Sequence, residues 1–439
     1  MPKKLTMIGA GLAGPLMASY LSERGYSVDI FERRLDMRCV NQSAGRSINL
    51  ALSKRGIKAL KEIGVYKLIK PMMLPMVGRM IHDNHGNTHL QKYGQKKSEV
   101  IYSISRAFLN KTIMDYAESK DDVKITFEHP LIGVDLNQNK LIFQDKIKKF
   151  ERLFGSDGSS SKIRDSINKV QPIGYRNLPL DHGYKELTIP PDAEGNYRMD
   201  SKSLHIWPRG DFMLIALPNI DKSFTCTLFF PLNGKLSFSS INSGEKIIKF
   251  FSSYFPDTVE LIPDLKEEYV NNPVGKLSTI YCNRWHFEDK ALIFGDAAHA
   301  IVPFFGQGMN ASFQDCSIIN EFIIKYDGNW DKIFSRFSDV QVPNGHAIAD
   351  MAIENYIEMR DSVNDPMFIK RRELEFELES RFTERFVPRY SMVSFTTIPY
   401  SEVYRRGLLQ LGLIDNYIAG KISKSVLYEQ IKNQLDPIR

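Results

Sequence analysis

Three glycines near the start of the chain have a spacing typical of a tight turn between a strand and a helix. Gly9, Gly11 and Gly14 follow the short apolar segment Lys4–Ile8 and overlap the start of Leu12–Arg24, which has the pattern of a helix. In this G-x-G-x-x-G arrangement the first glycine allows the turn, the second lets backbone approach a pyrophosphate, and the third lets the helix pack closely on the strand. The helix N-terminus would offer free N–H groups to the phosphates.

An acidic residue follows at the distance that a dinucleotide-binding fold requires. The segment Ser27–Phe31 is predicted to be a second strand, and it ends at Glu32, whose carboxylate can accept hydrogen bonds from ribose hydroxyls. An apolar stretch behind Lys3 and Lys4 would also fit a signal peptide, but three glycines interrupt it. The order strand, glycines, helix, strand and acid therefore predicts a dinucleotide-binding domain.

Two later motifs extend this prediction to one bound FAD. GSDGSSSKIR occupies Gly155–Arg164, and GDAAHAIVPFFGQGMN occupies Gly295–Asn310. Within the second of these, Gly306 and Gly308 permit close approach of the backbone to a ligand. The segment Asn310–Ile324 is predicted to be a helix, and the positive end of its dipole would stabilise negative charge on a reduced flavin. In this order, the three motifs predict that distant parts of the chain contact different parts of the same FAD.

The composition is that of an ordinary globular protein. The 439 residues suffice for two or three domains, and 43% of them are hydrophobic and 25% charged. The net charge of +6 arises from 58 basic and 52 acidic residues without a long block of one sign, so we expect no nucleic-acid partner. The four cysteines form no C-x-x-C pair, and no run of about 18 apolar residues is present. We therefore expect a soluble, cytoplasmic protein.

The elements that must position the motifs are predicted to form an α/β fold with a discontinuous domain. We expect a Rossmann-like FAD-binding domain with a parallel sheet, made of residues 1–70, 100–165 and 280–345. An antiparallel, β-rich substrate domain (71–99 and 166–279) would interrupt it, and C-terminal helices (346–439) would follow. Within the substrate domain, Gly78–Asp83 and Thr88–Tyr93 are predicted to be strands joined by a turn at the sequence NHGN.

These motifs resemble those of class A FAD-dependent aromatic hydroxylases. The pattern D-G-x-x-S-x-x-R is matched at residues 157–164, and the GD motif is matched at residues 295–296. More narrowly, the chain is similar to the kynurenine 3-monooxygenase family over almost its whole length. The strings that carry this similarity are GRSINLALSKRG (45–56), GRMIHD (78–83), GDAAHAIVPFFGQGMNASFQD (295–315) and ENYIEMRD (354–361). General flavin hydroxylases would not be expected to share GRMIHD and ENYIEMRD.

The resemblance assigns residues to the FAD. Glu32 and Arg33 match the ribose and adenine end, Arg106 matches an arginine at the phosphates or ribose, and Asp296 matches the aspartate that binds the ribityl chain. An alternative interpretation of Asp296 is a helix cap. The expected cofactor-binding residues are Gly9, Gly11, Ala13, Gly14, Glu32, Arg33, Ala51, Arg106, Leu131, Asp157, Asp296, Gly308, Met309 and Asn310.

The resemblance also implies a substrate, L-kynurenine, which is an amino acid with an aminobenzoyl ring. A carboxylate is well bound by an arginine fork, and Arg79 matches the family arginine with that task. Arg79 could instead be a surface residue of a strand. The expected substrate-binding residues are Arg79, Tyr93, Asn355 and Tyr390 at the polar end, and Phe304 and Phe305 at the aromatic ring. Some family members carry a histidine in place of Phe305.

The implied reaction uses NADPH to reduce FAD, O2 to form a flavin hydroperoxide, and L-kynurenine as the acceptor that becomes 3-hydroxy-L-kynurenine. It belongs to tryptophan catabolism towards quinolinate and NAD synthesis. No residue is assigned as an acid–base catalyst, because the amino group of the substrate already donates electrons into the ring. Two alternatives stay open, a class A hydroxylase of another aromatic acid and a non-catalytic flavin-binding redox sensor. The oligomeric state also stays open, a homodimer included.

Several other features are given no chemical role. His82 and His89 lie on either side of the predicted NHGN turn and His85 lies within it, so their side chains would point to different faces, and we predict no metal site there. His299 is interpreted as a packing or positioning residue. Charged residues interrupt the segment 401–439, so we expect a bacterial-type enzyme without the hydrophobic tail of animal and fungal family members. The apolar face of Leu408–Ile418 leaves weak membrane contact open.

Overall fold

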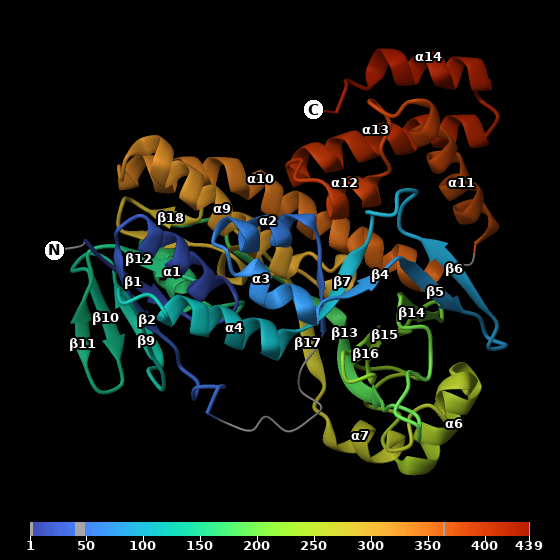
Figure 1. Cartoon of the computed structure of the whole chain (residues 1–439), viewed down its shortest axis with the longest axis horizontal. Coiled ribbons are helices and arrows are strands. Elements are labelled where there is room, and N and C mark those ends of the chain that lie inside the picture. The colour runs from blue at the N-terminus through green and yellow to red at the C-terminus, as the bar shows by residue number, and fades with distance from the viewer. Residues whose placement is uncertain (1–2, 40–48, 363–364, 439) are drawn as a thin grey trace. The chain divides into compact units, whose positions relative to one another are not determined.

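A computed structural model of the chain describes residues 3–39, 49–362 and 365–438 (Figure 1). The chain folds into two compact units, each built from three separate segments. Unit 1 comprises Met1–Met73, Ile104–Leu180 and Lys276–Ala352, and unit 2 comprises Leu74–Ser103, Asp181–Gly275 and Ile353–Arg439.

A six-stranded sheet forms the centre of unit 1, in the order β18-β19-β12-β1-β2-β8. Neighbouring strands are parallel except at the edge, where β18 and β19 are antiparallel. The strands are β1 (Lys4–Ile8), β2 (Ser27–Phe31), β8 (Val123–Thr126), β12 (Leu153–Gly155), β18 (His286–Phe287) and β19 (Ala291–Ile293). The three glycine-containing motifs begin where β1, β12 and β19 end. Because the carboxyl ends of parallel strands meet at one edge of a sheet, the fold brings these motifs together.

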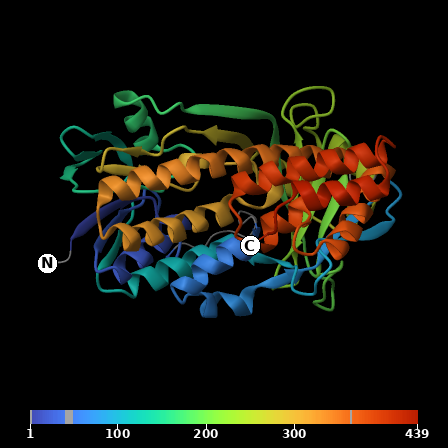
Figure 2. The same cartoon turned by 90° about the horizontal axis from the view of Figure 1, so that it is seen from above.

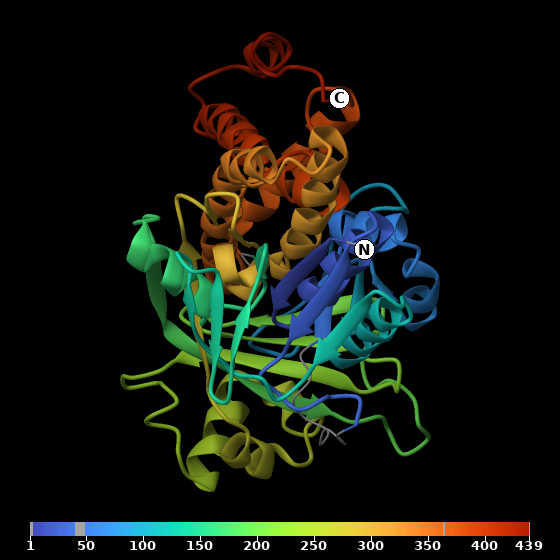
Figure 3. The ribbon, with the colours of Figure 1, turned by 90° about the vertical axis from the view of Figure 1, so that its left-hand side faces the viewer.

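Helices and a small second sheet complete unit 1. The three-stranded antiparallel sheet of β9 (Leu131–Asp135), β10 (Lys140–Phe143) and β11 (Ile147–Lys149) is blue-green in Figure 3. Strand β3 (Asn49–Leu52) follows the undescribed residues 40–48. The helices are α1 (Ala13–Glu23), α2 (Lys54–Glu62), α3 (Tyr66–Ile69), α4 (Arg106–Glu118), α5 (Lys162–Val170), α8 (Asp296–His299), α9 (Gly308–Tyr326) and the first part of α10 (Trp330–Ile357), together with the 3₁₀ segments η1 (Lys70–Met72) and η3 (Pro303–Phe305).

Helices α9 and α10 run side by side within unit 1 (Figure 2). A hydrogen bond of 2.7 Å from Gln341 on α10 to Asp315 on α9 joins them. Helix α9 begins at Gly308, two residues before the predicted start at Asn310, so Gly308 and Met309 lie in its first turn. Helix α10 continues through Pro343 across the boundary between the units.

A mixed sheet forms the framework of unit 2, with the strand order β13-β16-β15-β14-β5-β6. All neighbours are antiparallel except β14 and β5. The strands are β5 (Gly78–His82), β6 (Thr88–Lys92), β13 (Arg176–Ile189), β14 (Ser203–Pro208), β15 (Met213–Pro218) and β16 (Phe224–Pro231). Strand β13 and its neighbour β17 (Gly275–Tyr281) cross the boundary between the units, and β4 (Leu74–Met76) pairs with β7 (Ile101–Ser105). The predicted hairpin at NHGN is confirmed, with each strand one residue shorter than expected.

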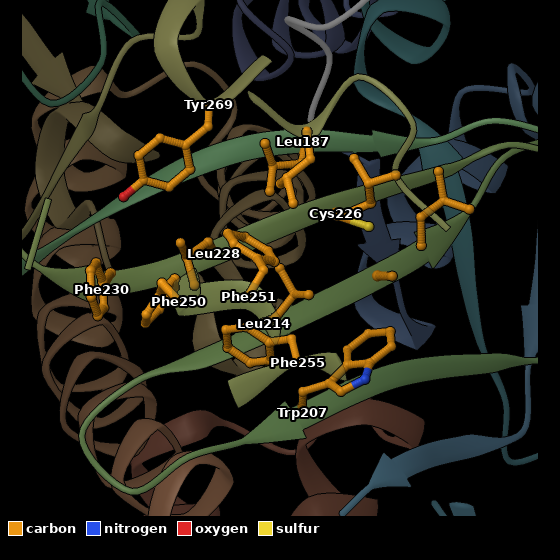
Figure 4. Packing of buried hydrophobic residues seen from close by; sticks show 14 of the residues in the cluster. Leu187, Trp207, Leu214, Cys226, Leu228, Phe230, Phe250, Phe251, Phe255 and Tyr269 are labelled. Atoms are coloured by element: carbon orange, nitrogen blue, oxygen red, sulfur yellow. The ribbon is translucent and has the colours of Figure 1, made fainter. Parts of the chain in front are cut away.

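The core of unit 2 lies between one face of this sheet and the helix α6 (Gly244–Tyr254). Figure 4 shows side chains of β13, β15 and β16 pointing toward aromatic rings at residues 250, 251 and 255. Trp207 on β14 belongs to the same cluster and is fully buried. Because successive side chains of a strand point to opposite faces of the sheet, Leu187 on β13, Leu214 on β15 and Leu228 on β16 all lie on the face that forms the core. The segment η2 (Pro256–Thr258) and helix α7 (Leu265–Asn271) follow α6.

The C-terminal helices form part of unit 2. They follow a π-helical turn, Glu358–Ser362, and are α11 (Pro366–Arg381), α12 (Arg389–Phe395), α13 (Tyr400–Ile418) and α14 (Lys424–Gln434). The N–H of Gly210 donates to the carbonyl of Arg360, which ties the π-helical turn to the end of β14. The predicted α/β class, with a parallel Rossmann-like sheet, a β-rich unit and C-terminal helices, is confirmed. The assignment of cofactor and substrate to particular domains stays a prediction.

Candidate functional site

The glycine loop after β1 is closed at two positions and open at one. Gly9 has φ of +102°, a conformation that L side chains rarely adopt, and its N–H donates to Phe31. A side-chain carbon at Gly14 would lie 2.1 Å from the carbonyl oxygen of Gly9, so only glycine lets α1 begin this close to the strand. At Gly11, which is exposed, a side-chain carbon would meet no atom within 4 Å. The loop is therefore open where phosphates approach in such folds.

Glu32, at the end of β2, is fixed in front of this loop. Its carboxylate accepts hydrogen bonds from the backbone N–H of Ala10 at 2.8 Å and of Arg34 at 3.0 Å. Two backbone donors orient the carboxylate, which is only half-buried and can accept further bonds. The neighbouring Arg33 is exposed. Helix α1 has no side-chain N-cap bond and no acidic residue in its first turn, so its N–H groups suit an anion.

The motif after β12 has a structural part and an open part. Asp157 Oδ2 accepts a hydrogen bond of 2.7 Å from the N–H of Lys162, and Ser161 caps α5 by accepting from the N–H of Arg164. Asp157 Oδ1 is buried without a hydrogen-bond partner among the described residues, and burial raises the pKa of this carboxyl group. Asp157 thus accepts a hydrogen bond from the first turn of α5 with one oxygen, and its other oxygen stays available to a ligand.

Arg164, from the same motif, forms a hydrogen bond to the motif that follows β19. It is 2% exposed, and its guanidinium donates to the carbonyls of Ala297 at 3.1 Å and Ser159 at 2.9 Å. The ring of Tyr175 lies 4.4 Å from its central carbon, measured to the ring centroid. Two bonds to backbone carbonyls and one aromatic contact hold this buried guanidinium, and the bond to Ala297 lets Arg164 fix the backbone of α8.

Asp296 begins α8 with its side chain exposed. The residue before it, Gly295, has φ of +58° and is the N-cap, and no side-chain capping bond is present at this helix. The alternative role of Asp296 as a helix cap therefore has no support in the geometry. Its carboxylate makes no hydrogen bond within the described residues and is available to a ligand hydroxyl.

Asn310 joins two segments that are far apart in the sequence. Its side-chain amide donates to the carbonyls of Ala51 and Gly306, both at 2.8 Å, and its side-chain oxygen accepts from the N–H of Ser53 at 2.9 Å. The side chain is fully used in this way, so only the backbone of residue 310 can serve a cofactor. Helix α9 has no side-chain N-cap bond and no acidic residue in its first turn, which leaves N–H groups near Gly308 for a ligand.

The remaining expected cofactor residues also lie in unit 1. Arg106 is the exposed first residue of α4, and Leu131 is the half-buried first residue of β9. Ala51 lies in β3, within 3.0 Å of the position that a side-chain carbon at Gly306 would occupy. The predicted string at residues 45–56 begins at residues 45–48, outside the described part of the chain. Open glycine backbone, uncapped helix N-termini and the unpaired oxygens of Asp157 and Asp296 together fit FAD.

Unit 2 brings the predicted polar substrate residues together around Arg79. Arg79 is 7% exposed and donates to Glu358 at 3.2 Å and to Asn355 at 3.3 Å. The rings of Tyr93 and Tyr390 stack on each other with centroids 4.9 Å apart, and the guanidinium carbon lies 5.1 Å from the ring of Tyr390. The alternative of a surface arginine is wrong, because Arg79 is buried in a polar and aromatic cluster.

The two tyrosines of this cluster keep their protons and could donate hydrogen bonds to a ligand. Burial raises the pKa of Tyr93 and of Tyr390, so both hydroxyl groups stay protonated. The hydroxyl of Tyr93 is buried and has no hydrogen-bond partner of normal geometry among the described residues. An unpaired buried hydroxyl is costly, and a ligand carboxylate would satisfy it. The backbone carbonyl of Tyr93 is held by Arg372 on α11, at 2.7 Å.

Glu358 is the residue that the sequence did not single out. Glu358 lies three positions after Asn355, and side chains at this spacing lie on the same face of a helix. That spacing within ENYIEMRD was the available signal. Phe304 and Phe305 are buried in unit 1, in η3, directly before the left-handed Gly306.

The histidines that suggested metal at first sight bond to other groups. His205 donates through Nε2 to the carbonyl of Asp200, so its Nδ1 accepts from His82 Nε2 at 2.9 Å. His82 Nδ1 lies 2.8 Å from Asp257, which also accepts from the indole of Trp207. This buried chain ties β5 and β14 to η2, while His85 and His89 are exposed.

Comparison with known proteins places the chain in a family. Residues 7–42 match the sequence model of an NAD(P)-binding Rossmann-like domain, and residues 266–326 match that of an FAD binding domain. The kynurenine 3-monooxygenase of Myxococcus xanthus is 43% identical over 422 residues, covering 95% of this chain and 91% of the relative. That of Stenotrophomonas maltophilia is 44% identical over 418 residues, covering 94% of this chain and 91% of the relative.

The chain belongs to the kynurenine 3-monooxygenase family. This protein is therefore an FAD-dependent aromatic monooxygenase that uses a nicotinamide dinucleotide, as the sequence predicted. Solved structures confirm the fold alone. The tetrameric form of 2-methyl-3-hydroxypyridine-5-carboxylic acid oxygenase aligns with a TM-score of 0.69 at 16% identity, over 88% of this chain and 98% of that chain. PqsL of P. aeruginosa, in complex with 2-aminobenzoylacetate, aligns with a TM-score of 0.68 at 14% identity, over 82% and 97%.

Among residues 3–39, 49–362 and 365–438 of this member of the kynurenine 3-monooxygenase family, no helix is both long enough and apolar enough to cross a bilayer.

Proposed function

We propose that this protein hydroxylates L-kynurenine to 3-hydroxy-L-kynurenine, with FAD as bound cofactor and NADPH and O2 as co-substrates. The observation that carries this proposal is the cluster in unit 2 of buried Arg79, Asn355 and Tyr93 with half-buried Glu358 and Tyr390. It occurs in a chain that belongs to the kynurenine 3-monooxygenase family, and it has the charges and donors that an α-amino acid requires.

Arg79 and Glu358 complement the two charges of an amino acid. Without a ligand they form an ion pair of 3.2 Å. The substrate carboxylate would bind the guanidinium of Arg79, and the substrate ammonium would bind the carboxylate of Glu358. The guanidinium of Arg79, the carboxylate of Glu358 and the two charged groups of the substrate then alternate in sign, and each charge has a partner of opposite sign. A benzoate-type acid has no ammonium group and would leave Glu358 unpaired.

The neutral groups of the cluster select the carboxylate further. Tyr93 and Tyr390 keep their protons and can donate to a carboxylate oxygen, and Asn355 holds the guanidinium of Arg79 in place. The stacked rings of Tyr93 and Tyr390 already restrict each other, so less side-chain entropy is lost when a ligand binds. We expect the cluster to be largely preformed before the substrate enters.

Unit 1 supplies the groups that would hold FAD. Gly11 and Ala13 offer backbone N–H groups to the phosphates, and Glu32 can accept from ribose hydroxyls. Asp296 would accept from the ribityl chain, and the first turn of α9, Gly308 to Asn310, would donate to the isoalloxazine ring. When bound and reduced by NADPH, FAD would activate O2, so that one oxygen atom enters the substrate ring and the other leaves as water.

The protein has to orient the ring and keep water away rather than remove a proton. The amino group of the aminobenzoyl ring already raises the electron density at the neighbouring ring carbon. Phe304 and Phe305 present buried apolar side chains directly before the glycines of residues 306 and 308, which supports a dry surface at the flavin. Correct placement of the reacting carbon is itself a large part of the rate enhancement.

The decisive experiment measures NADPH oxidation and aromatic product with purified, FAD-loaded protein. L-Kynurenine, 4-hydroxybenzoate and kynuramine, which lacks the carboxylate, are compared at equal concentration. We expect L-kynurenine to stimulate NADPH oxidation and to yield 3-hydroxy-L-kynurenine, and kynuramine to react poorly. Product from 4-hydroxybenzoate but not from L-kynurenine would replace the proposed substrate. Bound FAD without turnover of any of the three would favour a redox sensor.

A further inference from the structure

A closed ring of hydrogen bonds underlies the segment that follows β19. Asp315 on α9 accepts from the N–H of Gly295 at 2.9 Å and from the imidazole of His299 at 2.6 Å. The N–H of His299 donates in turn to the carbonyl of Gly295, at 2.9 Å. Gly295, His299 and Asp315 therefore fix one another, and Asp296 lies inside the ring they form, as the residue after Gly295.

Asp315 is buried completely and yet fully satisfied. Its side chain is 0% exposed, and Gln341 on α10 donates to its second oxygen at 2.7 Å. Three donors at 2.6 to 2.9 Å are the environment of an ionised carboxylate. A buried negative charge needs a positive partner, and His299 is the ionisable side chain that contacts it.

His299 is held in a single orientation. Its ring stacks on Trp285 with centroids 4.8 Å apart, and it is 3% exposed. Burial alone would disfavour the imidazolium, but the carboxylates of Asp315 and Asp296 outweigh burial and raise the pKa of His299. His346 on α10 is a further titratable group that interacts electrostatically with His299. The Nδ1 atom of His299 is buried without a hydrogen-bond partner among the described residues.

The ring of hydrogen bonds stabilises the backbone at Gly295 and the short helix α8. Gly295 has φ of +58°, and α8 is only four residues long, so neither is stabilised by a regular element. The three bonds at Gly295 and His299 hold the start of α8, together with the bond from Arg164 to the carbonyl of Ala297 and that from the N–H of Ala298 to the carbonyl of Gly295. The exposed carboxylate of Asp296 is carried on this segment.

We propose that His299 and Asp315 are positioning residues that hold Asp296 in the conformation that binds the ribityl chain of FAD. The inference rests on the FAD-binding role of Asp296 within the proposed function. Neither residue would touch substrate, and neither would transfer a proton in the reaction. Their effect would be on the affinity for FAD, exerted through Asp296.

The test is a double-mutant cycle on FAD affinity, read from the fluorescence of flavin titrated with apoprotein. The variants are Asp296→Ala, His299→Leu and the two combined, with Asp315→Asn replacing His299→Leu in a second cycle. His299→Leu keeps apolar bulk against Trp285 and removes the donor. His299→Gln restores an amide donor at nearly the same reach. His286→Gln is the matched control, because that ring bonds only to the carbonyl of Glu288 among the described residues.

We expect His299→Leu to weaken FAD binding at least tenfold and His299→Gln to recover most of the loss. In the Asp296→Ala background, His299→Leu and Asp315→Asn should cause little further loss, because their effect passes through the missing carboxylate. Losses that add fully in both cycles, or a His299→Leu variant that binds FAD as tightly as the unaltered protein, would overturn the proposal. The cycle needs no kynurenine, so its failure is distinguishable from failure of the proposed substrate.

Discussion

The guanidinium of Arg164 donates a hydrogen bond of 3.1 Å to the carbonyl of Ala297, across 133 positions of sequence. This bond joins the second and third glycine-containing motifs of unit 1. It explains why an arginine ends the motif D-G-x-x-S-x-x-R, since no other side chain offers several donors in a fixed plane. The two motifs therefore act as one structural element that supports the residues proposed to bind FAD.

Replacing Arg164 by methionine should loosen FAD. The carbonyls of Ala297 and Ser159 would lose a charged donor in a buried place, a loss of about 2 kcal/mol each at most. We expect FAD affinity to fall about tenfold or more and the thermal midpoint to drop. Arg336→Met serves as the control, because Arg336 is 62% exposed and forms only a surface pair with Asp339. Equal behaviour of the two variants would contradict the role of Arg164.

Replacing two glycines of the first motif, Gly11 and Gly14, should impair the protein for different reasons. Gly11→Ala places its side-chain carbon in open space, so the apoprotein should fold normally while FAD binding weakens at least tenfold. Gly14→Ala places the carbon 2.1 Å from the Gly9 carbonyl and should destabilise the apoprotein itself. Thermal unfolding of the apoproteins and FAD titration separate the two effects. A Gly11→Ala variant with normal FAD affinity would argue against phosphate binding at this loop.

Arg79→Ala should remove kynurenine binding without removing FAD. The change leaves Glu358 without its partner and deletes the carboxylate fork. Arg79 is buried but the side chain of Glu358 is 30% exposed, so losing this partly buried pair costs less than the roughly 3 kcal/mol of a fully buried one. We expect KM for L-kynurenine to rise about a hundredfold, with the yellow colour of the protein retained. Loss of FAD from this variant would show that Arg79 serves the cofactor.

Tyr93→Phe provides a milder test of the same cluster. Because the Tyr93 hydroxyl lacks a partner among the described residues, its removal should not lower the thermal midpoint of the ligand-free protein. Binding of L-kynurenine should nevertheless weaken about tenfold to a hundredfold, because one hydrogen bond to a charged carboxylate contributes about 1.5 to 3 kcal/mol. Calorimetric titration with L-kynurenine and a thermal melt are the measurements. Unchanged affinity would remove Tyr93 from the substrate site.

Unit 2 should lose stability as the pH falls, through His205. Burial lowers the pKa of His205 from 6.5 to about 4. A histidine with a lowered pKa stabilises the fold above pH 6.5, and this contribution is lost as the pH falls from 6.5 towards 4, where the unfolded chain binds the extra proton. At about 1.4 kcal/mol for each tenfold change in proton affinity, the loss is about 3 kcal/mol at most.

The variant His205→Gln keeps hydrogen-bonding groups but cannot titrate. Its urea midpoint should depend less on pH over this range than that of the unaltered protein. His89→Gln is the control, since His89 is exposed on the hairpin. If both variants retain the full pH dependence, other groups cause it.

The sequence was sufficient for the class of fold and for the identity of the cofactor. Gly9, Gly11, Gly14 and Glu32 lie within one local unit of strand, turn, helix and strand, where spacing along the chain fixes spacing in space. The limits of β2 were predicted to the residue for the same reason. Strand β3 and helix α9 were harder, because what joins them is the side chain of Asn310, which spans 259 positions.

The tertiary structure decided which groups the polar side chains bond to. The sequence placed Asn355 and Arg79 in one substrate site only by resemblance, and it missed Glu358, although both acid and amide lie on one helical turn. It also could not distinguish Asp296 as a cap from Asp296 as a free carboxylate, which depends on Gly295 and Asp315. Local backbone preferences are written in neighbouring residues, whereas the pairing of buried charges depends on which distant segments the packing brings together.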